Sequence, residues 1–157
     1  MADRPNAVLR PATPEDVDDI LQLMSEPASR GLILPRSRAE ISSGLQYFTL
    51  AVIDGLVAGC VTRRDFGNGL VEIRSLVVDP DWQGMRLGSQ LVQAAVKAAE
   101  DAGAVRIFAL TYHPALFEYQ GFSRVDKHLF PQKVWHDCAK CRKRDHCDEI
   151  AVLKCVR

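Results

Sequence analysis

Apolar and polar positions follow two different periods along the chain, and the shorter period marks the strands. Alternating or continuous runs of β-branched, aliphatic and aromatic residues, bounded by glycine, proline or aspartate, are typical of buried strands. Two of these runs are joined by Asp54-Gly55, a dipeptide that favours a tight hairpin turn. The pattern predicts strands over residues 8–10, 48–53, 56–64, 70–78, 105–110, 122–125 and 149–156.

The longer period, in which apolar residues recur every three to four positions, marks the helices. Four apolar residues share one face of the first helix: Val17, Ile20, Leu21 and Met24. Ahead of them, Thr13 and Asp16 form a variant of the capping box, with Pro14 at the first helical position. A long amphipathic helix over residues 87–102 is ended by Gly103. Shorter helices are predicted over residues 38–47 and 114–120.

The order of these elements indicates the fold class. A strand is followed by two helices, three strands, a helix, a strand, a helix and two strands. Hairpins and crossover connections therefore coexist, which predicts an α/β (α+β) fold with a mixed sheet. The chain has 157 residues, a length that fits one domain with a sizeable core. We expect a single domain over residues 1–157, with a cysteine-rich excursion over residues 136–148 inside it.

Charge and composition narrow the classes of partner and the compartment. The formal net charge is zero, and no basic stripe dominates, so nucleic acid is not an expected partner. The N-terminal segment lacks the apolar stretch of a secretory signal. No run approaches the roughly 20 apolar residues that span a bilayer. Five cysteines, an odd number, fit a reducing compartment. We expect a cytoplasmic protein without a membrane partner.

The segment between the fourth strand and the long helix carries the strongest chemical signal. A strand, a glycine-containing loop and a helix follow one another directly, and the first N–H groups of a helix have no partner inside it. They bind anions, and the helix dipole adds to the attraction. We expect this loop to hold a phosphate group of a nucleotide-type ligand. Its residues are Gln83, Gly84, Met85, Arg86, Leu87, Gly88 and Ser89.

Two motifs, together with the order of elements, resemble the GNAT superfamily of acetyl-CoA-dependent N-acetyltransferases. The first is the Gln-x-x-Arg-x-Gly loop that begins at Gln83, and the second is Leu116-Phe117-x-x-x-Gly121-Phe122. The resemblance covers nearly the whole chain and implies a mixed sheet of six to seven strands flanked by helices. The loop departs from the family at Arg86, which stands where the first glycine is usual, so a positive φ is not expected there.

Further segments resemble the acetyltransferase domain of the N-acetylglutamate synthase family. That family makes N-acetyl-L-glutamate in arginine biosynthesis. Its longer members carry an amino-acid-kinase-like domain in front, so the chain resembles the short, stand-alone form, and regulation by arginine cannot be assumed. The matching segments are Leu34-Pro35-Arg36-Ser37-Arg38-Ala39-Glu40, Gly59-Cys60, Val71-Glu72-Ile73, Phe108-Ala109-Leu110-Thr111 and Leu129-Phe130-Pro131.

The resemblance implies two small-molecule substrates, acetyl-CoA and L-glutamate. The pantetheine arm of coenzyme A would lie along the backbone of Leu76, Val77 and Val78 like an added strand. The pyrophosphate would bind the N–H groups of the loop over residues 83–89. Backbone N–H groups of the fourth strand would hold the oxyanion of the tetrahedral intermediate.

Acetyl transfer to an amine needs a base, because an α-amino group is mostly ammonium at neutral pH. Glu72 is the candidate, because it lies on the strand that leads to the proposed thioester site. In a regular strand, residues 72, 74, 76 and 78 would share its face. The alternative is that Glu72 pairs with Arg74 or faces solvent. Tyr112 is a candidate acid, because Phe117 replaces the family's tyrosine; the alternative for Tyr112 is an aromatic residue packed on the core.

A dicarboxylate acceptor needs cations. Arg36 matches the carboxylate-binding arginine of the synthase family, and a guanidinium group holds a carboxylate through two parallel hydrogen bonds. Arg38 and Lys133 are candidates to assist it. The alternative for each of these cations is an exposed side chain that binds no ligand.

The cysteine-rich segment raises the question of a metal. Cys138, Cys141 and Cys147 have ligand types that suit structural zinc, with His136, His146 or Cys155 as the fourth ligand. The spacing differs from that of common zinc fingers, and a domain of this size does not require a metal to fold. We therefore expect reduced cysteines and no metal.

Two alternative functions stay open from the sequence, and so does the oligomeric state. The acceptor amine can belong to another amino acid or to a protein N-terminus. The chain can instead be a non-catalytic sensor that binds acyl-CoA, with its cysteine-rich segment as an interaction surface. It can also form a homodimer, because dimers through edge strands are common in the superfamily that it resembles.

Overall fold

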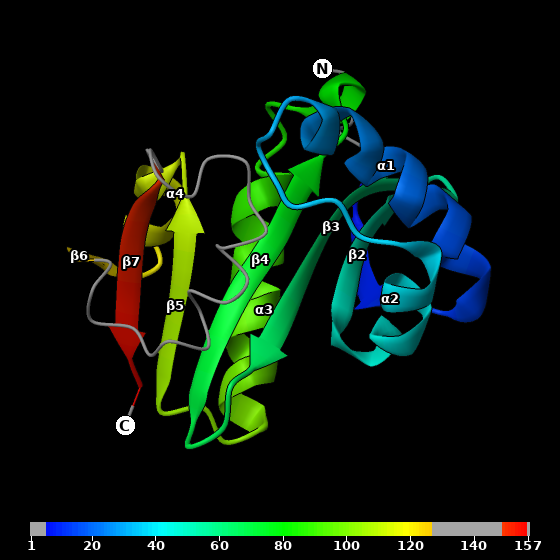
Figure 1. Cartoon of the computed structure of the whole chain (residues 1–157). Coiled ribbons are helices and arrows are strands. Elements are labelled where there is room, and N and C mark those ends of the chain that lie inside the picture. The colour runs from blue at the N-terminus through cyan, green and yellow to red at the C-terminus, as the bar shows by residue number, and fades with distance from the viewer. Residues whose placement is uncertain (1–5, 127–148, 157) are drawn as a thin grey trace.

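A single mixed sheet organises the protein. The computed structural model describes residues 6–126 and 149–156, and their strands form one seven-stranded sheet in the order β1-β2-β3-β4-β5-β7-β6 (Figure 1). Neighbouring strands are antiparallel except for β4 and β5, which are parallel. The strands are β1 (Val8–Pro11), β2 (Phe48–Ile53), β3 (Leu56–Asp65), β4 (Leu70–Val78), β5 (Arg106–Thr111), β6 (Ser123–Val125) and β7 (Ile150–Cys155).

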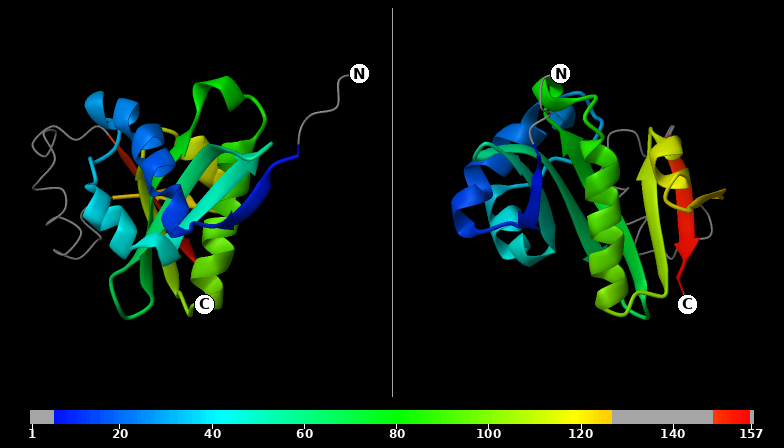
Figure 2. Two further views of the ribbon diagram at one scale, coloured as in Figure 1. Left: turned by 90° about the vertical axis from the view of Figure 1, so that its right-hand side faces the viewer. Right: turned by 180° about the vertical axis from the view of Figure 1, so that it is seen from behind.

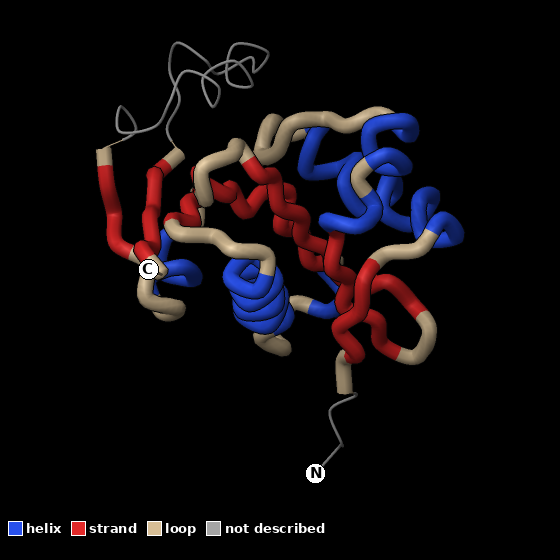
Figure 3. The backbone as a smooth tube through the Cα atoms, turned by 90° about the horizontal axis from the view of Figure 1, so that it is seen from below, coloured by secondary structure: helices blue, strands red, loops and turns tan. Residues whose placement is uncertain are grey.

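Helices cover both faces of the sheet. Figure 3 shows α1 and α2 on one side of the strands and α3 and α4 on the other, and Figure 2 shows α3 running along the rear face of the sheet. The predicted α/β (α+β) class and mixed sheet are confirmed. The helices are α1 (Val17–Ser29), α2 (Arg38–Ser43), α3 (Leu87–Asp101) and α4 (Pro114–Glu118).

The apolar stripe of α3 forms the centre of the larger core. Leu91, Val92 and Ala99 are fully buried against the sheet, as their helical spacing predicts. On β3, Gly59 lets this helix approach closely, since a Cβ atom there would lie 3.0 Å from the Leu91 Cδ1 atom. Gly103 ends the helix with φ of 98°, which confirms its expected position just past the helix.

The opposite face carries a second core beneath α1 and α2. Ile20 and Ile41 from these helices pack with Cys60 and Val77 of the sheet. The helix predicted over residues 38–47 is shorter than expected, because α2 stops at Ser43 and a 3₁₀ turn follows over Leu45–Tyr47. Gly44 separates the two pieces with φ of −114°, as expected of a residue with low helix propensity.

Two turns in the sheet have the geometry that their sequences predict. Asp54 and Gly55 have φ of 51° and 78°, the two positive values of a type I′ hairpin turn. Phe66 is held over the following turn by a hydrogen bond from its N–H group to the carbonyl of Leu70, at 2.8 Å. Strands β2, β3 and β4 therefore form a continuous antiparallel meander.

A β-bulge in β4 changes which side chains face each core. Cys60 pairs with Val77 and Thr62 pairs with Arg74, so β4 has one residue more than β3 between these pairs. The extra residue is accommodated at Ser75, which has φ of 54°. The expectation that residues 72, 74, 76 and 78 share one face is therefore wrong beyond Arg74. Leu76 and Val78 pack on the core beneath α3, whereas Val77 packs beneath α1 and α2.

The pairing of β4 with β5 stops early. Ladder pairs join Leu70 to Arg106, Val71 to Ile107 and Glu72 to Phe108. Beyond Glu72 the two strands separate toward their C-terminal ends (Figure 1). This opening in the sheet positions the cavity described below.

An ion pair fixes the first strand to the first helix. Arg10 donates to both carboxylate oxygens of Asp16, at 2.7 and 3.0 Å. The Thr13 N–H group donates to the same carboxylate at 2.7 Å, so the expected capping box is present. The hydrogen bonds from Arg10 are the main reason that the pKa of Asp16 falls from 3.8 to about 2.

This ion pair predicts how the stability depends on pH. The folded-state pKa of Asp16 lies below its unfolded value, so its contribution is complete above pH 4 and is lost as the pH falls toward 2. We expect Asp16→Asn to lower the free energy of unfolding at pH 7 by about 2 kcal/mol, with a much smaller difference near pH 2. Urea unfolding at several pH values measures this. Asp19→Asn, an exposed change on the same helix, is the control, and equal losses at pH 7 and pH 2 would contradict the assignment.

Candidate active site

A large cavity lies where β4 and β5 separate. Its volume is about 920 Å³. Six parts of the described chain line it: β4 from Glu72 onward, the loop and first turn of α3, the end of β5 with the segment after it, helix α4, the end of α1 with the loop that follows it, and Glu149 ahead of β7. The size suits a ligand that is larger than an amino acid.

The loop ahead of α3 contributes one wall of this cavity. A 3₁₀ turn, Pro80–Trp82, leads into Gln83, and Gly84 follows with φ of 86°. The predicted anion-binding loop thus reaches the cavity except at Met85, which packs against the core beneath α3. The loop residues that line the cavity are Gln83, Gly84, Arg86, Leu87, Gly88 and Ser89.

Arg86 adopts a conformation that the sequence did not predict. Its φ is 61°, in the left-handed region where a non-glycine residue costs about 1–2 kcal/mol. The residue is the N-cap of α3, and its carbonyl accepts the N–H group of Gln90 at 3.1 Å. The backbone turns sharply there, and the N–H groups of the first helical turn lie at the edge of the cavity. Arg86 therefore combines a left-handed N-cap backbone with a cationic side chain at the predicted anion-binding loop.

Glu72 lies at the point where the cavity begins. It is the last residue of β4 that pairs with β5, it lines the cavity, and it is 7% exposed. Arg74, on the same face, donates to the Glu72 Oε1 atom from Nε at 2.9 Å and also from Nη2. The pairing that the sequence left as an alternative is therefore present, and it occurs inside the cavity.

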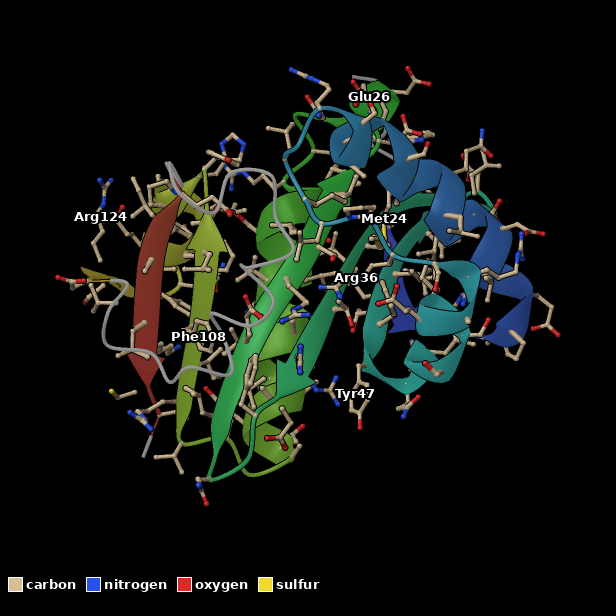
Figure 4. The ribbon with its side chains drawn as sticks, in the orientation of Figure 1. Met24, Glu26, Arg36, Tyr47, Phe108 and Arg124 are labelled. Carbon is tan, nitrogen blue, oxygen red and sulfur yellow. The ribbon has the colours of Figure 1, made fainter. Side chains whose placement is uncertain are left out.

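Arg36 reaches the cavity from the opposite wall. Figure 4 shows this side chain in front of the sheet, beside α2, and 19% of it is exposed. Its Nη1 atom lies 3.6 Å from the Glu40 Oε2 atom. Glu40 is held in turn by the Ser37 N–H group, at 3.0 Å, which lowers the pKa of this carboxyl group. The capping box of α2 thus anchors Arg36.

The other predicted site residues lie in different surroundings. Tyr112 lines the cavity just after β5. Arg38 does not line it, because its side chain is 61% exposed and pairs with Asp18 on α1. Lys133 lies outside the described residues, as does the cysteine-rich segment with Cys138, Cys141 and Cys147. Among the residues that the structure does describe, no group of histidine, cysteine and carboxylate side chains is arranged to hold a metal ion.

Several cavity residues were not found from the sequence. Leu32, Ile33 and Leu34 form an apolar wall ahead of Arg36, and three consecutive apolar residues between two helices were the available signal. His113 and Glu149 also line the cavity. His113 and Glu149 lie close together because β5 pairs with β7. No local sequence motif predicts this long-range pairing.

Two side chains near the cavity are chemically inert. Phe117 stands where the resemblance would place a tyrosine, and it packs edge-on against Phe122 with ring centres 5.3 Å apart. Burial raises the pKa of the Cys60 thiol to about 12, so this cysteine stays protonated and is a poor nucleophile. Neither side chain offers a group for proton transfer or covalent catalysis.

Comparison with known proteins establishes the family. Residues 16–122 match the model of the Acetyltransferase (GNAT) family. The chain belongs to this family and is an acyltransferase. None of its described helices has the length and apolar character needed to cross a membrane.

Relatives and solved structures agree with this assignment. An uncharacterized N-acetyltransferase from Chlorobaculum tepidum is 34% identical over 146 residues, which cover 93% of this chain and 94% of the relative. An amino-acid acetyltransferase from Shewanella oneidensis is also 34% identical, over 80% of this chain but only 28% of its own length. The chain therefore spans less than a third of that relative.

The fold has a close structural counterpart. N-acetylglutamate synthase from Neisseria gonorrhoeae, solved with coenzyme A and N-acetyl-glutamate, aligns with a TM-score of 0.85 at 23% identity. The alignment covers 99% of this chain and 36% of that one. The predicted GNAT fold is confirmed, and the aligned synthase was solved with the predicted type of co-substrate, coenzyme A.

The loop geometry predicts the effect of a charge at Gly88. A Cβ atom there would lie 3.4 Å from a methyl group of Leu116, so a larger side chain must extend along the cavity wall. We expect Gly88→Glu to weaken coenzyme A binding at least tenfold, or about 1.4 kcal/mol, because it brings a negative charge near the phosphates. Isothermal titration calorimetry measures this affinity.

Gly88→Gln is the matched control, because it adds the same length without the charge. A carboxylate in the first turn also favours the helix, so weaker binding by Gly88→Glu is not expected to come from unfolding. Unchanged coenzyme A affinity in folded Gly88→Glu would show that the phosphates bind elsewhere.

Proposed function

We propose that the chain transfers the acetyl group of acetyl-CoA to the α-amino group of L-glutamate and releases N-acetyl-L-glutamate, the first step of arginine biosynthesis. The observation that carries this proposal is the convergence of three features in one cavity: the anion-binding loop of α3, the carboxylate of Glu72, and the guanidinium of Arg36. The Shewanella oneidensis relative is named an amino-acid acetyltransferase, which supports an amino acid as acceptor.

In this proposal, coenzyme A lies in the opening between β4 and β5. The edge of β4 beyond Glu72 is not paired with β5, so its backbone groups can hydrogen-bond to pantetheine over residues 76–78. The pyrophosphate binds the first turn of α3 and the loop that contains Arg86. These two contacts place the thioester near Glu72.

The chemistry is a direct transfer. Glu72 removes a proton from the ammonium group of the acceptor, either directly or through water. The neutral amine attacks the thioester carbonyl, so that a C–N bond forms and the C–S bond breaks. Backbone N–H groups of β4 stabilise the oxyanion. The thiolate is protonated by Tyr112 or by solvent, because a thiol with an ordinary pKa near ~8.5 leaves with little assistance.

The acceptor carboxylates require a cation in the cavity, and Arg36 is the proposed ligand. Its ion pair with Glu40, at 3.6 Å, keeps the guanidinium beside the N-terminus of α2. A rigid bidentate donor discriminates between a carboxylate and a carboxamide. This property would favour glutamate over glutamine.

One competing function has support from an observation. The Chlorobaculum tepidum relative covers nearly the whole chain and is named only as an N-acetyltransferase, so the same chemistry on a different amine is the second candidate. A panel of amino acids and N-terminal peptides, assayed for release of the coenzyme A thiol, separates the two. Turnover with any amine would also exclude a purely sensory role for the cavity.

The base assignment predicts the behaviour of Glu72→Gln. We expect kcat to fall by ~10²–10⁴, with coenzyme A affinity nearly unchanged, because a carboxamide cannot accept the ammonium proton. Steady-state kinetics between pH 6 and 9 and calorimetry measure the two quantities. Glu118→Gln, an exposed carboxylate change on α4, is the control. A Glu72→Gln enzyme with wild-type kcat across this pH range would contradict the assignment of Glu72 as the base.

The acceptor assignment predicts a selective effect at Arg36. We expect Arg36→Ala to raise the KM for glutamate at least tenfold, because the carboxylate loses a charged bidentate partner, while the KM for acetyl-CoA hardly changes. Arg30→Ala, an exposed arginine at the end of α1, is the control. If the wild-type enzyme acetylates glutamate no faster than neutral amino acids, glutamate is not the acceptor, and the acetyltransferase reading remains for another amine.

A further inference from the structure

The Arg74–Glu72 ion pair is largely buried in the sheet. The Glu72 side chain is 9% exposed and that of Arg74 is 13% exposed. A buried ion pair usually gains little stability over an apolar pair of similar size, because desolvation offsets the attraction. Its presence at the mouth of a ligand cavity therefore suggests a functional reason rather than a structural one.

The geometry of the pair is set by the backbone of β4. Glu72 is the last residue paired with β5, and the bulge at Ser75 follows Arg74 directly. Glu72 and Arg74 therefore share the last regular stretch of the strand, on one face. Across the ladder, Arg74 faces Thr62, whose hydroxyl group donates to the Tyr47 carbonyl at 3.2 Å. The bulge at Ser75 fixes the register of β4 against β3. This register keeps Arg74 beside Glu72.

The contact itself is asymmetric. The Nε and Nη2 atoms of Arg74 both donate to Oε1 of Glu72. Two donors on a single oxygen orient the plane of the carboxylate and stabilise its charged form.

We propose that Arg74 is a positioning residue for the base, which keeps Glu72 ionised and fixes the orientation of its carboxylate relative to the acceptor amine. The proposal rests on the proposed role of Glu72 as base. It assigns Arg74 no contact with substrate, which distinguishes it from Arg36. The acceptor site then has two arginines with different tasks, one for the carboxylate of the substrate and one for the carboxylate of the enzyme.

Other groups around Glu72 also act on its charge and must be kept constant in a test. Among the described residues, five titratable or charged side chains come from the elements around it: Arg64 opposite Glu72 on β3, Arg36 ahead of α2, Tyr112 and His113 after β5, and Glu149 before β7. None of them is changed by a substitution at Arg74. A shift in titration that follows this substitution therefore reports the loss of the Arg74 contact.

The test compares Arg74→Gln with wild type through two readouts. In protein with ¹³C-labelled glutamate, the Glu72 carboxyl resonance is identified by its loss in Glu72→Gln and is titrated by NMR. In parallel, kcat/KM for the acceptor found by the amine panel is measured against pH. We expect the pKa of Glu72 to rise by about one unit or more, since a neighbouring cation lowers a carboxyl pKa by 1–3 units. The acid limb of the rate profile should move to higher pH by the same amount.

Two further variants keep the test interpretable. Arg74→Lys retains a cation, so a folded Arg74→Lys enzyme should keep the acid limb close to that of wild type even if Arg74→Gln unfolds. Arg63→Gln removes an arginine on the neighbouring strand whose guanidinium lies 5.4 Å from the Tyr47 ring centre. This control should leave both readouts unchanged.

Three results would overturn the proposal, and each points to a different cause. If neither readout moves, Arg74 does not hold the base, although the assignment of Glu72 can still stand on the kinetics of Glu72→Gln. If the NMR titration moves and the rate profile does not, Glu72 is not the base, and the proposed chemistry fails with it. If only the KM for the acceptor rises, Arg74 binds the substrate carboxylate directly.

Discussion

The separation of β4 from β5 after Glu72 is the constraint on which the rest of the structure depends. Parallel pairing over Leu70–Arg106, Val71–Ile107 and Glu72–Phe108 holds the two halves of the sheet together, and beyond Glu72 no described strand pairs with this edge of β4. Unpaired edges in a sheet are normally covered or blocked. Here this part of β4 lines a cavity of about 920 Å³, where the proposed ligand would use its backbone groups.

Local structural features, a β-bulge and a helix cap, then fix two walls of the cavity. The bulge at Ser75 turns Leu76 and Val78 toward α3 and Val77 toward α1, so both faces of β4 are anchored in apolar cores. The ligand can therefore use the main chain of this segment while the side chains stay in the core. On the far wall, the Ser37–Glu40 capping box fixes the start of α2 and with it Arg36. Rigid walls of this kind reduce the entropy that is lost when a ligand is bound.

The sequence predicted the elements well, because most of them depend on local signals. The hairpin at Asp54-Gly55, the end of α3 at Gly103 and the capping box at Asp16 all follow from short motifs, and the structure confirms them. The bulge at Ser75 was missed, because serine has no strong preference for a positive φ and a bulge is read only from the pairing register. The break at Gly44 was also missed, since one glycine in a helical pattern is usually tolerated.

The site was predictable to a lesser extent, because it is assembled from distant segments. The loop ahead of α3 was singled out from the sequence, since its strand, turn and helix are contiguous, and the structure shows that it lines the cavity. Glu72 and Arg36 were singled out only with the help of the family resemblance, and the contact between Glu72 and Arg74 remained one of two alternatives. The contributions of His113 and Glu149 depend on the pairing of β5 with β7. Such pairings are set by the whole fold and leave no local trace in the sequence.

The left-handed conformation of Arg86 has a consequence for how this loop tolerates substitution. Glycine at this position would remove the backbone strain, but it would also remove a positive charge from the cavity wall. A β-branched residue would have the strain without the charge, because its side chain crowds the backbone in this region of φ and ψ. At this backbone position, glycine therefore gives less strain and no charge, whereas arginine gives more strain and a positive charge. With arginine here, the loop is less stable than it would be with glycine, and the start of α3 carries an additional cation.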